Sequence, residues 1–388
     1  MNAQPHARFP TQTLPPWRRA VLKVGSSLLS EAGQLTTRNA QALARFIAAS
    51  RSAGREVVLV SSGAVAAGRA QLARTSTLSG GLVLRQALAA LGQTQMIALW
   101  QSLIDVPVAQ VLLSHDDLRN RRRYLNARNT LLELLKLGAL PVVNENDTVA
   151  VEELKLGDND NLAAMVAALI DADLLLIASD VDGLYSAHPQ RDPDAKPVLL
   201  VDALTPQIFA MAGDAGSALG TGGMRTKLEA ARKATSAGIA TVLFNGTNAA
   251  TIDELAGGML RGTRIVAAGT RLAARKHWLR HAPGAHAAAI QIDAGAARAL
   301  RDGKSLLPGG IVAVDGDFAR GDLVDIVLIE TGGAENSIAR GLTQYSSNEA
   351  RRIAGKKSTA IEAILGFSYG DTLVHRDDLV VFDAALPA

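Results

Sequence analysis

The sequence contains no cysteine, which excludes disulfide bonds and thiolate metal sites. Its 7 histidines are scattered and never form the HExxH spacing, which argues against a zinc enzyme. No apolar run approaches the roughly 18 residues that a membrane-spanning helix needs. The net charge is only +3, so electrostatics make no strong case for nucleic acid or an acidic membrane as the main partner. Together these absences lead us to expect a soluble, cytoplasmic protein.

The sequence does have enough material for two globular domains. Its 388 residues exceed the size at which a single core usually keeps growing. Hydrophobic residues make up 48% and charged residues 20%, which is the balance of an ordinary globular protein. The first segment, MNAQPHARFPTQTLPPW, is polar and proline-containing and lacks the apolar core of a secretory signal. We expect residues 1–18 to be a disordered leader.

From residue 19 onward, short apolar runs alternate with longer helical patterns. Strands are expected at residues 20–24, 57–60, 108–113, 142–143, 174–177 and 241–244, and helices at 36–53, 82–103 and 115–137. Strands that are apolar throughout and separated by helices indicate a mainly parallel sheet covered on both faces, an α/β fold. Ligands of such sheets bind at the carboxyl ends of the strands.

The composition changes after about residue 269. Residues 271–286 are basic and read as a connector, and short β-like runs with glycine turns follow at 290–292, 311–314, 323–329 and 379–382. The pattern predicts a separate small, mainly β domain of ordinary size. We place the first domain at residues 19–275, the linker at 276–285 and the second domain at 286–388.

Two dense polar clusters mark the rim of the predicted sheet. They read Asn144-Glu145-Asn146-Asp147 and Asp158-Asn159-Asp160-Asn161. Asn and Asp suit turns and helix caps because their side chains compete for backbone hydrogen bonds, so two turns remain an alternative. Ordinary turns need only one or two such residues, and we favour a binding function for the clusters.

A glycine-rich segment, GTGGMRTK at residues 220–227, precedes a helical pattern. Exposed backbone N–H groups at a helix N-terminus suit a phosphate, and Arg225 and Lys227 add positive charge. A flexible hinge would explain the glycines but not the adjacent cations. The segment is not the GxxxxGK[ST] loop, because Thr226 precedes the lysine.

Lys23 stands near the carboxyl end of an otherwise apolar strand. Burying an ammonium group without a partner is costly, so we favour a phosphate-binding role over an edge-strand lysine that faces solvent. Phosphoryl transfer needs mainly positioning and neutralisation of negative charge. Lys23 and Lys227 could supply that charge, Asp160 could orient both, and Ser62-Gly63 offers a hydroxyl and a close backbone approach.

In combination, these segments resemble the amino acid kinase family. The resemblance is carried by VLKVGSSLL at 21–29, VSSGAVAAGR at 60–69, VVNENDTVA at 142–150, LGDNDNLAA at 156–164 and GTGGMRTK at 220–227. It implies an αβα sandwich on a mainly parallel sheet. The C-terminal SLLPGGIVAVDGDFARGD and VHRDDLVV resemble a PUA domain. Within the family, the resemblance is to the kinases that phosphorylate L-glutamate on its side-chain carboxylate at the start of proline biosynthesis.

The resemblance also implies ATP and Mg²⁺ as cofactors and a role for each matching residue. The phosphate lysines would be Lys23 and Lys227, with Asp160 organising them. L-Glutamate would be held by Ser62, Gly63, Asn144, Asp147, Asp158 and Asn159. ATP would be held by Lys23, Ser179, Asp180, Thr221, Gly222, Gly223, Met224, Arg225, Thr226 and Lys227. No residue is assigned as a metal ligand. The expected partners are a homo-oligomer, dimer or tetramer, and functional coupling to glutamate 5-phosphate reductase.

Other readings of the sequence remain open. A sister enzyme of the same family would phosphorylate N-acetylglutamate, aspartate or carbamate instead. A protein that binds RNA through its second domain is a different class, and the cations at Arg351-Arg352 and Lys356-Lys357 fit it, although few aromatic residues lie there. The basic run from Arg119 to Arg123 is read as a solvated helix face.

Overall fold

The computed structural model describes residues 8–31, 34–72, 81–149, 159–189, 192, 194–212, 223–269, 288–329 and 335–382. The chain divides into two compact units, one of residues 1–119 and 127–270 and the other of residues 120–126 and 271–388. The predicted linker at 276–285 lies outside the described residues, so the boundaries that we placed around it stay predictions.

The first unit is built on an eight-stranded sheet in the order β6-β7-β5-β2-β8-β10-β12-β9. All neighbouring strands are parallel except β10 and β12. The strands are β2 Arg19–Val24, β5 Glu56–Ser61, β6 Val108–Leu113, β7 Leu140–Glu145, β8 Leu174–Ser179, β9 Leu200–Val201, β10 Ala240–Asn245 and β12 Gly262–Ile265. The predicted mainly parallel sheet is confirmed, whereas β9 and β12 were not predicted.

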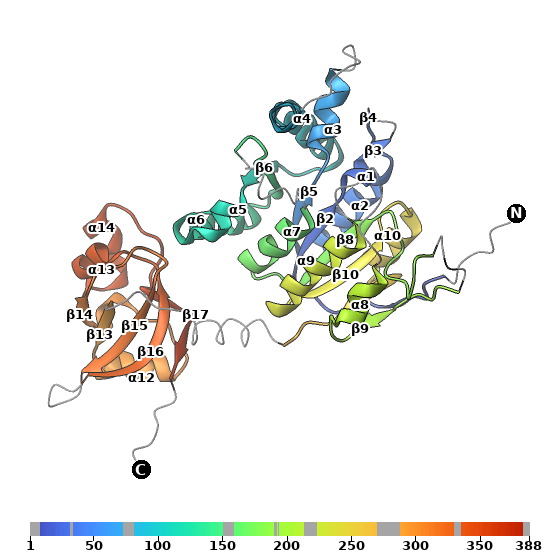
Figure 1. Ribbon diagram of the computed structural model, residues 1–388. Coiled ribbons are helices and arrows are strands. Elements are labelled where there is room, and N and C mark those ends of the chain that lie inside the picture. Colours follow the sequence, from blue (N-terminus) through green and yellow to red (C-terminus); the bar gives the residue numbers. More distant parts are fainter. Residues whose placement is uncertain are drawn as a thin grey trace, which may run out of the picture. The chain divides into compact units, whose positions relative to one another are not determined.

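Helices cover both faces of this sheet (Figure 1). On one face α2 (Arg38–Ser52), α4 (Leu82–Leu103) and α10 (Ala249–Ala256) share a core with every second residue of the strands, such as Leu22 and Val24. On the opposite face lie α7 (Asn159–Leu169) and α9 (Met224–Ser236), which contact each other and the central strands. Successive side chains of a strand point to opposite faces, so Lys23 points toward α7 and α9.

The remaining elements of this unit are short or lie at its edges. They are α1 Ser26–Leu29, β3 Ser30–Glu31, β4 Gln34–Leu35, α3 Ala64–Gln71, α5 His115–Arg119, α8 Pro206–Met211, β1 Gln12–Thr13 and β11 Met259–Leu260. Helix α6 (Arg121–Lys136) has its first residues, 121–126, in the second unit and the rest in the first. The single helix predicted over 115–137 is therefore two helices. The helical conformation is interrupted at Asn120. The side-chain oxygen of Asn120 accepts a hydrogen bond from the Arg123 backbone N–H at 3.1 Å and so caps α6.

The prediction of a disordered leader is wrong for residues 9–18. Phe9, Leu14 and Trp17 are only 1%, 5% and 9% exposed. The intervening strand β1 pairs antiparallel with β11, with Gln12 opposite Leu260. The polar and proline-rich composition concealed three widely spaced apolar side chains whose partners lie far away in the sequence. Residues 1–7 lie outside the described residues.

Helices α3 and α4 pack with their backbones in close contact. A Cβ at Gly92 would lie 1.8 Å from the Ala64 carbonyl oxygen, and one at Gly68 would lie 1.9 Å from the Leu88 carbonyl oxygen. Only glycine fits at either position, since any side chain would overlap the facing backbone. Farther along α4, the fully buried Trp100 packs in the main core.

The second unit contains a five-stranded sheet in the order β14-β13-β15-β16-β17. Its strands are β13 Ala289–Ile292, β14 Ile311–Asp315, β15 Leu323–Ile329, β16 Glu335–Thr343 and β17 Val374–Val381. The helices are α12 Ala294–Arg301, α13 Ser347–Ile353 and α14 Ile361–Leu365, with 3₁₀ turns at Pro308–Gly310 and Ser358–Ala360. The predicted mainly β domain is confirmed, although β16 was missed. In the described part of the chain, no helix combines the length and hydrophobicity that membrane crossing requires.

Candidate active site

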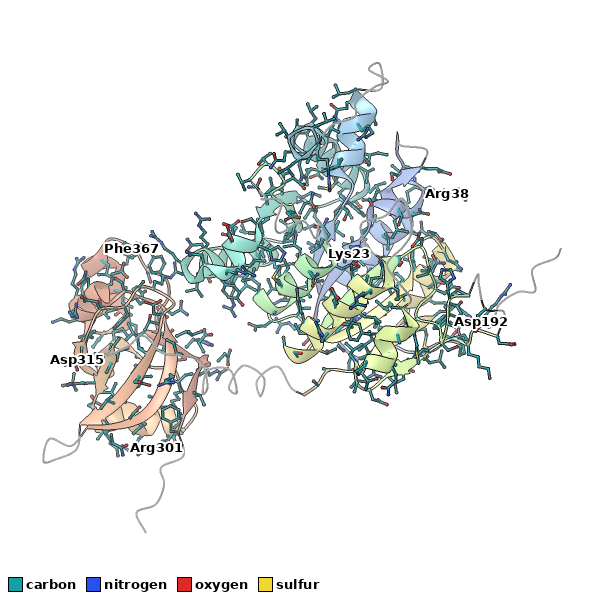
Figure 2. The ribbon with its side chains drawn as sticks, in the orientation of Figure 1. Lys23, Arg38, Asp192, Arg301, Asp315 and Phe367 are labelled. Atoms are coloured by element: carbon teal, nitrogen blue, oxygen red, sulfur yellow. The ribbon has the colours of Figure 1, made fainter. Side chains whose placement is uncertain are left out.

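The carboxyl ends of the central strands bring most of the predicted site residues to one edge of the first unit. Lys23 lies in β2, Ser62 directly follows β5, Asn144 ends β7 with Glu145, and Ser179 ends β8. Asp160 and Lys227 reach the same edge from the first turns of α7 and α9. Figure 2 shows Lys23 inside the unit, well away from the labelled Arg38 and Asp192 at its margin. Three predicted site residues, Asp158, Thr221 and Gly222, lie outside the described residues.

Asp160 lies between the two predicted phosphate lysines. Its Oδ1 is 2.5 Å from Lys23 Nζ, and its Oδ2 is 3.6 Å from Lys227 Nζ. The Asp160 side chain is fully buried, and the lysine side chains are 7% and 8% exposed. Two ammonium groups therefore converge on one carboxylate in a buried place. Converging ammonium groups at the carboxyl ends of the strands suit an anionic ligand such as a phosphate.

The lysines keep the Asp160 carboxyl ionised. Burial alone would raise the pKa of Asp160, but the charges of Lys23 and Lys227 outweigh burial and hold the pKa below its usual value. The Thr226 hydroxyl strengthens the effect, since it lies 3.0 Å from Asp160 Oδ2 and can donate to it. The same hydroxyl is 2.8 Å from the carbonyl of Gly223, the residue that precedes α9, and so links the carboxylate to that loop.

A second cluster of neutral polar side chains is centred on Asn159, the neighbour of Asp160 in α7. Its Nδ2 donates to Ser62 Oγ at 2.6 Å and to Asn144 Oδ1 at 2.9 Å. Its Oδ1 is buried and has no hydrogen-bond partner within the described ranges. This oxygen can accept a hydrogen bond from a ligand. The first turn of α7 therefore joins the charged cluster to an uncharged polar cluster.

The backbone around Ser62 is held from behind by the core. Trp100 Nε1 donates to Ser61 Oγ at 2.9 Å, and both side chains are fully buried. Ser61 Oγ in turn lies 3.2 Å from the Ser62 carbonyl, to which it can donate. Gly63 follows with φ +111°, a left-handed conformation that favours glycine, and directly precedes α3. These contacts hold the Ser62 backbone in place.

Asp147 lies in the turn after β7 and is partly buried. Burial raises the pKa of Asp147 above its usual value, and the positive charge of Arg85 on α4 offsets only part of that rise. A partly desolvated carboxylate gains from an additional cationic partner, such as the ammonium group of an amino acid.

The segment after β8 lies beside the end of β10. The Ser179 carbonyl accepts from the Gly246 backbone N–H at 2.7 Å, and the Ser179 hydroxyl lies 3.2 Å from Asp180 Oδ1. Two residues farther, Asp182 Oδ1 accepts from Asn245 Nδ2 at 2.8 Å. Ser179 is 5% exposed, whereas Asp180 is exposed to solvent. Hydrogen bonds between the segments that follow β8 and β10 therefore hold this part of the rim in place.

The first turn of α9 is the described part of the predicted glycine loop. Gly223 precedes the helix, and the orphan N–H groups of the first turn form a site suited to an anion. Lys227 is directed to Asp160, but Arg225 is 59% exposed and lies 3.5 Å from Glu229 on its own helix. The structure therefore brings Lys227 and Thr226 into the charged cluster and leaves Arg225 outside it.

Sequence reasoning missed several residues that support the site. Trp100 reads as one apolar residue of an amphipathic stretch, and nothing in its spacing points to Ser61. Arg85 stands in a helix more than fifty positions before Asp147 in the sequence. The only available signal for Ser61 was its place beside Ser62 in the Ser-Ser-Gly segment.

Two family descriptions match this sequence. The Amino acid kinase family matches residues 18–245, and the PUA domain matches residues 288–365. The first match spans more than half of the chain and contains both clusters of the rim. The second falls within the unit that holds the five-stranded sheet.

Curated relatives match nearly the full length of the chain. Glutamate 5-kinase of Xylella fastidiosa (strain 9a5c) is 62% identical over 379 residues, which is 97% of this chain and 98% of the relative. Glutamate 5-kinase of Xanthomonas oryzae pv. oryzae (strain KACC10331 / KXO85) is 63% identical over 363 residues, 93% of this chain and 100% of the relative. Among solved structures, carbamate kinase from Giardia lamblia bound to AMP-PNP has a TM-score of 0.46 at 19% identity, covering 64% of this chain and 98% of that chain.

Proposed function

This chain belongs to the amino acid kinase family, in its glutamate 5-kinase branch, and from that premise we propose that its rim transfers the γ-phosphate of ATP to the side-chain carboxylate of L-glutamate. A carboxylate oxygen attacks the γ-phosphorus while the bond to the bridging oxygen of ADP breaks. The products are L-glutamyl 5-phosphate and ADP. The glutamate carboxyl, with an ordinary pKa of about 4.3, is already ionised at neutral pH, so the step needs no general base.

The single observation that carries this proposal is the buried Lys23–Asp160–Lys227 cluster. In it the Asp160 carboxylate lies 2.5 Å from Lys23 Nζ and 3.6 Å from Lys227 Nζ, so two ammonium groups converge on one place. In phosphoryl transfer, negative charge spreads over the oxygens of the moving group, and fixed cations stabilise it. The two ammonium groups reach this place from β2 and α9, and Asp160 holds them together against their mutual repulsion and directs them. The N-termini of α7 and α9 add their positive dipole ends.

The proposed glutamate pocket is the neutral cluster beside the lysines. The Ser62 hydroxyl, the Asn144 amide and the free Oδ1 of Asn159 offer both donors and acceptors. Asp147 would pair with the amino group of glutamate, because burial raises the pKa of its carboxyl and a cationic partner would stabilise the ionised form. Gly63 and Asp158 complete the proposed set. Because Asn159 directly precedes Asp160, a bound glutamate would present its side chain to the phosphate lysines.

The proposed nucleotide site comprises Ser179, Asp180 and the start of α9 at residues 223–227, and Thr221 and Gly222, which lie outside the described residues, stay predicted members of it. Within the described residues, no three acidic or histidine side chains gather into a group that could hold a metal ion. Mg²⁺ prefers to keep several waters and to bind phosphate oxygens together with one or two carboxylates. It therefore fits this rim as a companion of ATP, and Asp180, an exposed carboxylate, is the side chain we propose to lie closest to it. The ion would neutralise phosphate charge.

We also propose that the chain acts in the cytoplasm as a homo-oligomer, dimer or tetramer. Support comes from α4, where Val83 and Leu91 are 78% and 41% exposed, an apolar exposure that suits a contact with another copy. Light scattering at several protein concentrations would measure the oligomeric state. An acyl phosphate hydrolyses readily in water, so we further propose functional coupling to glutamate 5-phosphate reductase.

A hydroxylamine trap tests the reaction. Purified protein with ATP, Mg²⁺ and L-glutamate should form glutamyl hydroxamate, whereas N-acetylglutamate, aspartate and carbamate should give little product. A preference for one of these other acceptors would assign the chain to a different substrate, and no hydroxamate with any acceptor would overturn the proposed reaction. The Asp253→Asn variant, which changes an exposed carboxylate paired with Arg45, serves as a control that should keep full activity.

A further inference from the structure

The segment from Phe9 to Thr13, here called the N-terminal strap, packs against the residues that follow β8 and the proposed nucleotide site. Phe9 is 1% exposed, and its ring meets the ring of Tyr185 edge-on, with centroids 5.1 Å apart and an interplanar angle of 83°. These two residues and Ala195 form a hydrophobic cluster separate from the main core. The strap therefore makes an apolar contact outside the main core.

The same ring fills the space beside Gly183. A Cβ at Gly183 would lie 2.7 Å from Phe9 Cζ and 2.7 Å from Thr263 Oγ1, so the backbone of residue 183 is in direct contact with both. The Thr263 hydroxyl also accepts from the Leu184 backbone N–H at 2.8 Å. Gly183 is only three residues after Asp180. Phe9 thus supports, from behind, the segment 180–185 that continues from Ser179 at the rim.

The strap itself is anchored at several points. The Phe9 carbonyl accepts from Arg261 Nη1 at 2.9 Å, and Arg261 is held in turn by Glu254 at 2.8 Å. Gln12 Nε2 donates to the carbonyls of Gly262 at 2.9 Å and Leu199 at 3.2 Å. These contacts join the strap to β12 and to the residue before β9, and they keep the Phe9 ring from moving away from Gly183.

We propose that Phe9 is a positioning residue for the nucleotide, which fixes the segment 180–185 in the conformation that ATP binds. The inference rests on the proposed binding of ATP at Ser179 and Asp180. Without the ring, Gly183 would face an empty space, and the segment would gain other conformations that do not bind. Binding to a state that is only partly populated is weakened by the same fraction. Glutamate binding should not change, because Ser62 follows β5, Asn144 lies in β7 and Asn159 lies in α7, none of which belongs to the segment 180–185.

Calorimetric binding of AMP-PNP with Mg²⁺ tests this on the full chain. Phe9→Ala should weaken AMP-PNP binding about tenfold, and Phe9→Leu, which fills part of the space, should recover most of the affinity. The matched control is Leu14→Ala, which removes a buried apolar side chain that belongs to the main core instead. The control should lower thermal stability while leaving AMP-PNP binding within about twofold of wild type. In the kinase assay, Phe9→Ala should raise KM for ATP and not KM for glutamate.

The outcomes separate this inference from the proposed reaction. Equal weakening by Phe9→Ala and Leu14→Ala, or no weakening by Phe9→Ala, would overturn the role of Phe9 even if the wild-type protein phosphorylates glutamate. A wild-type protein that binds AMP-PNP but forms no hydroxamate would refute the reaction while the binding series still decides on Phe9. If Phe9→Ala does not fold, Gln12→Ala and Phe9→Leu carry the test. Each should weaken AMP-PNP about two- to threefold, and unchanged binding in both overturns the inference.

Discussion

Replacing Asp160 by asparagine keeps the size of the side chain and removes the charge that the two lysines share. The wild-type carboxylate is 2.5 Å from Lys23 Nζ and 3.6 Å from Lys227 Nζ, in a place where neither lysine side chain is more than 8% exposed. Removing one partner of a buried ion pair costs about 3–5 kcal/mol, because the other charge stays buried. We expect Asp160→Asn to lower the free energy of unfolding by about that amount.

The same change should impair turnover more than binding. The amide can no longer orient two ammonium groups, and loss of one fixed electrostatic contact to the transition state costs about 10²- to 10³-fold in kcat. ATP should stabilise the variant against heat more than it stabilises the wild type, since phosphates supply the missing negative charge. Hydroxamate formation and thermal unfolding with and without ATP measure both effects, with Asp253→Asn as the exposed control. A folded variant with near-normal turnover would refute the organising role of Asp160.

The pH dependence of stability tests the direction of the pKa shift of Asp160. The pKa of Asp160 is lowered in the folded state, so its contribution is complete above the unfolded-state pKa of about 3.9 and is lost as pH falls through the folded-state pKa. The difference in unfolding free energy between wild type and Asp160→Asn should be constant near neutral pH and should shrink below about pH 4. A difference that grows on acidification would contradict the assignment.

Three further changes probe other parts of the rim and its support. Trp100→Phe removes the hydrogen-bond donor to the buried Ser61 hydroxyl. It should lower the free energy of unfolding, measured in urea, by about 1–3 kcal/mol more than Trp17→Phe, because the buried Nε1 of Trp17 has no hydrogen-bond partner in the described ranges. Equal losses in the two variants would refute the argument. Gly92→Ala should lower the free energy of unfolding by about 3 kcal/mol or more, because its Cβ would lie 1.8 Å from a backbone oxygen. Gly81→Ala, whose Cβ would have no atom within 4 Å, should leave the unfolding midpoint nearly unchanged. Because burial raises the pKa of Asp147, KM for glutamate should rise as pH is lowered from neutral toward that pKa. The Asp147→Asn variant should have a higher KM at every pH and should lose this part of the pH dependence. Identical pH profiles of KM in the two proteins would show that Asp147 does not bind the ammonium group.

The parts of this fold that could be predicted are those determined by local pattern. The continuous apolar runs that became β2, β5 and β8 are typical of central parallel strands, and the carboxyl-end rule then placed Lys23 and Ser179 on one rim. Asp160 was assigned from the resemblance and from the need of two cations for a shared anion, and its distances to both lysines fit that assignment.

The parts that could not be predicted depend on pairing across long stretches of sequence. Gln12 lies opposite Leu260, and no local signal in a polar, proline-rich segment indicates such a partner. Phe9 is buried because Gly183 leaves space for its ring, a fit that only the assembled structure reveals. The short edge strand β9 has two residues and no periodicity of its own. Long-range contacts of this kind outweigh local propensity.

The most direct test of the central reaction follows the oxygen atoms of glutamate. L-Glutamate with ¹⁸O in both oxygens of its side-chain carboxylate is incubated with the protein, ATP, Mg²⁺ and hydroxylamine, and the released phosphate is analysed by ³¹P NMR or mass spectrometry. If the carboxylate attacks the γ-phosphorus, its oxygen bridges carbon and phosphorus and leaves with phosphate when hydroxylamine attacks the carbonyl carbon, so each phosphate should carry one labelled oxygen. Unlabelled phosphate formed at the rate of ADP would show transfer to water instead and would contradict the account.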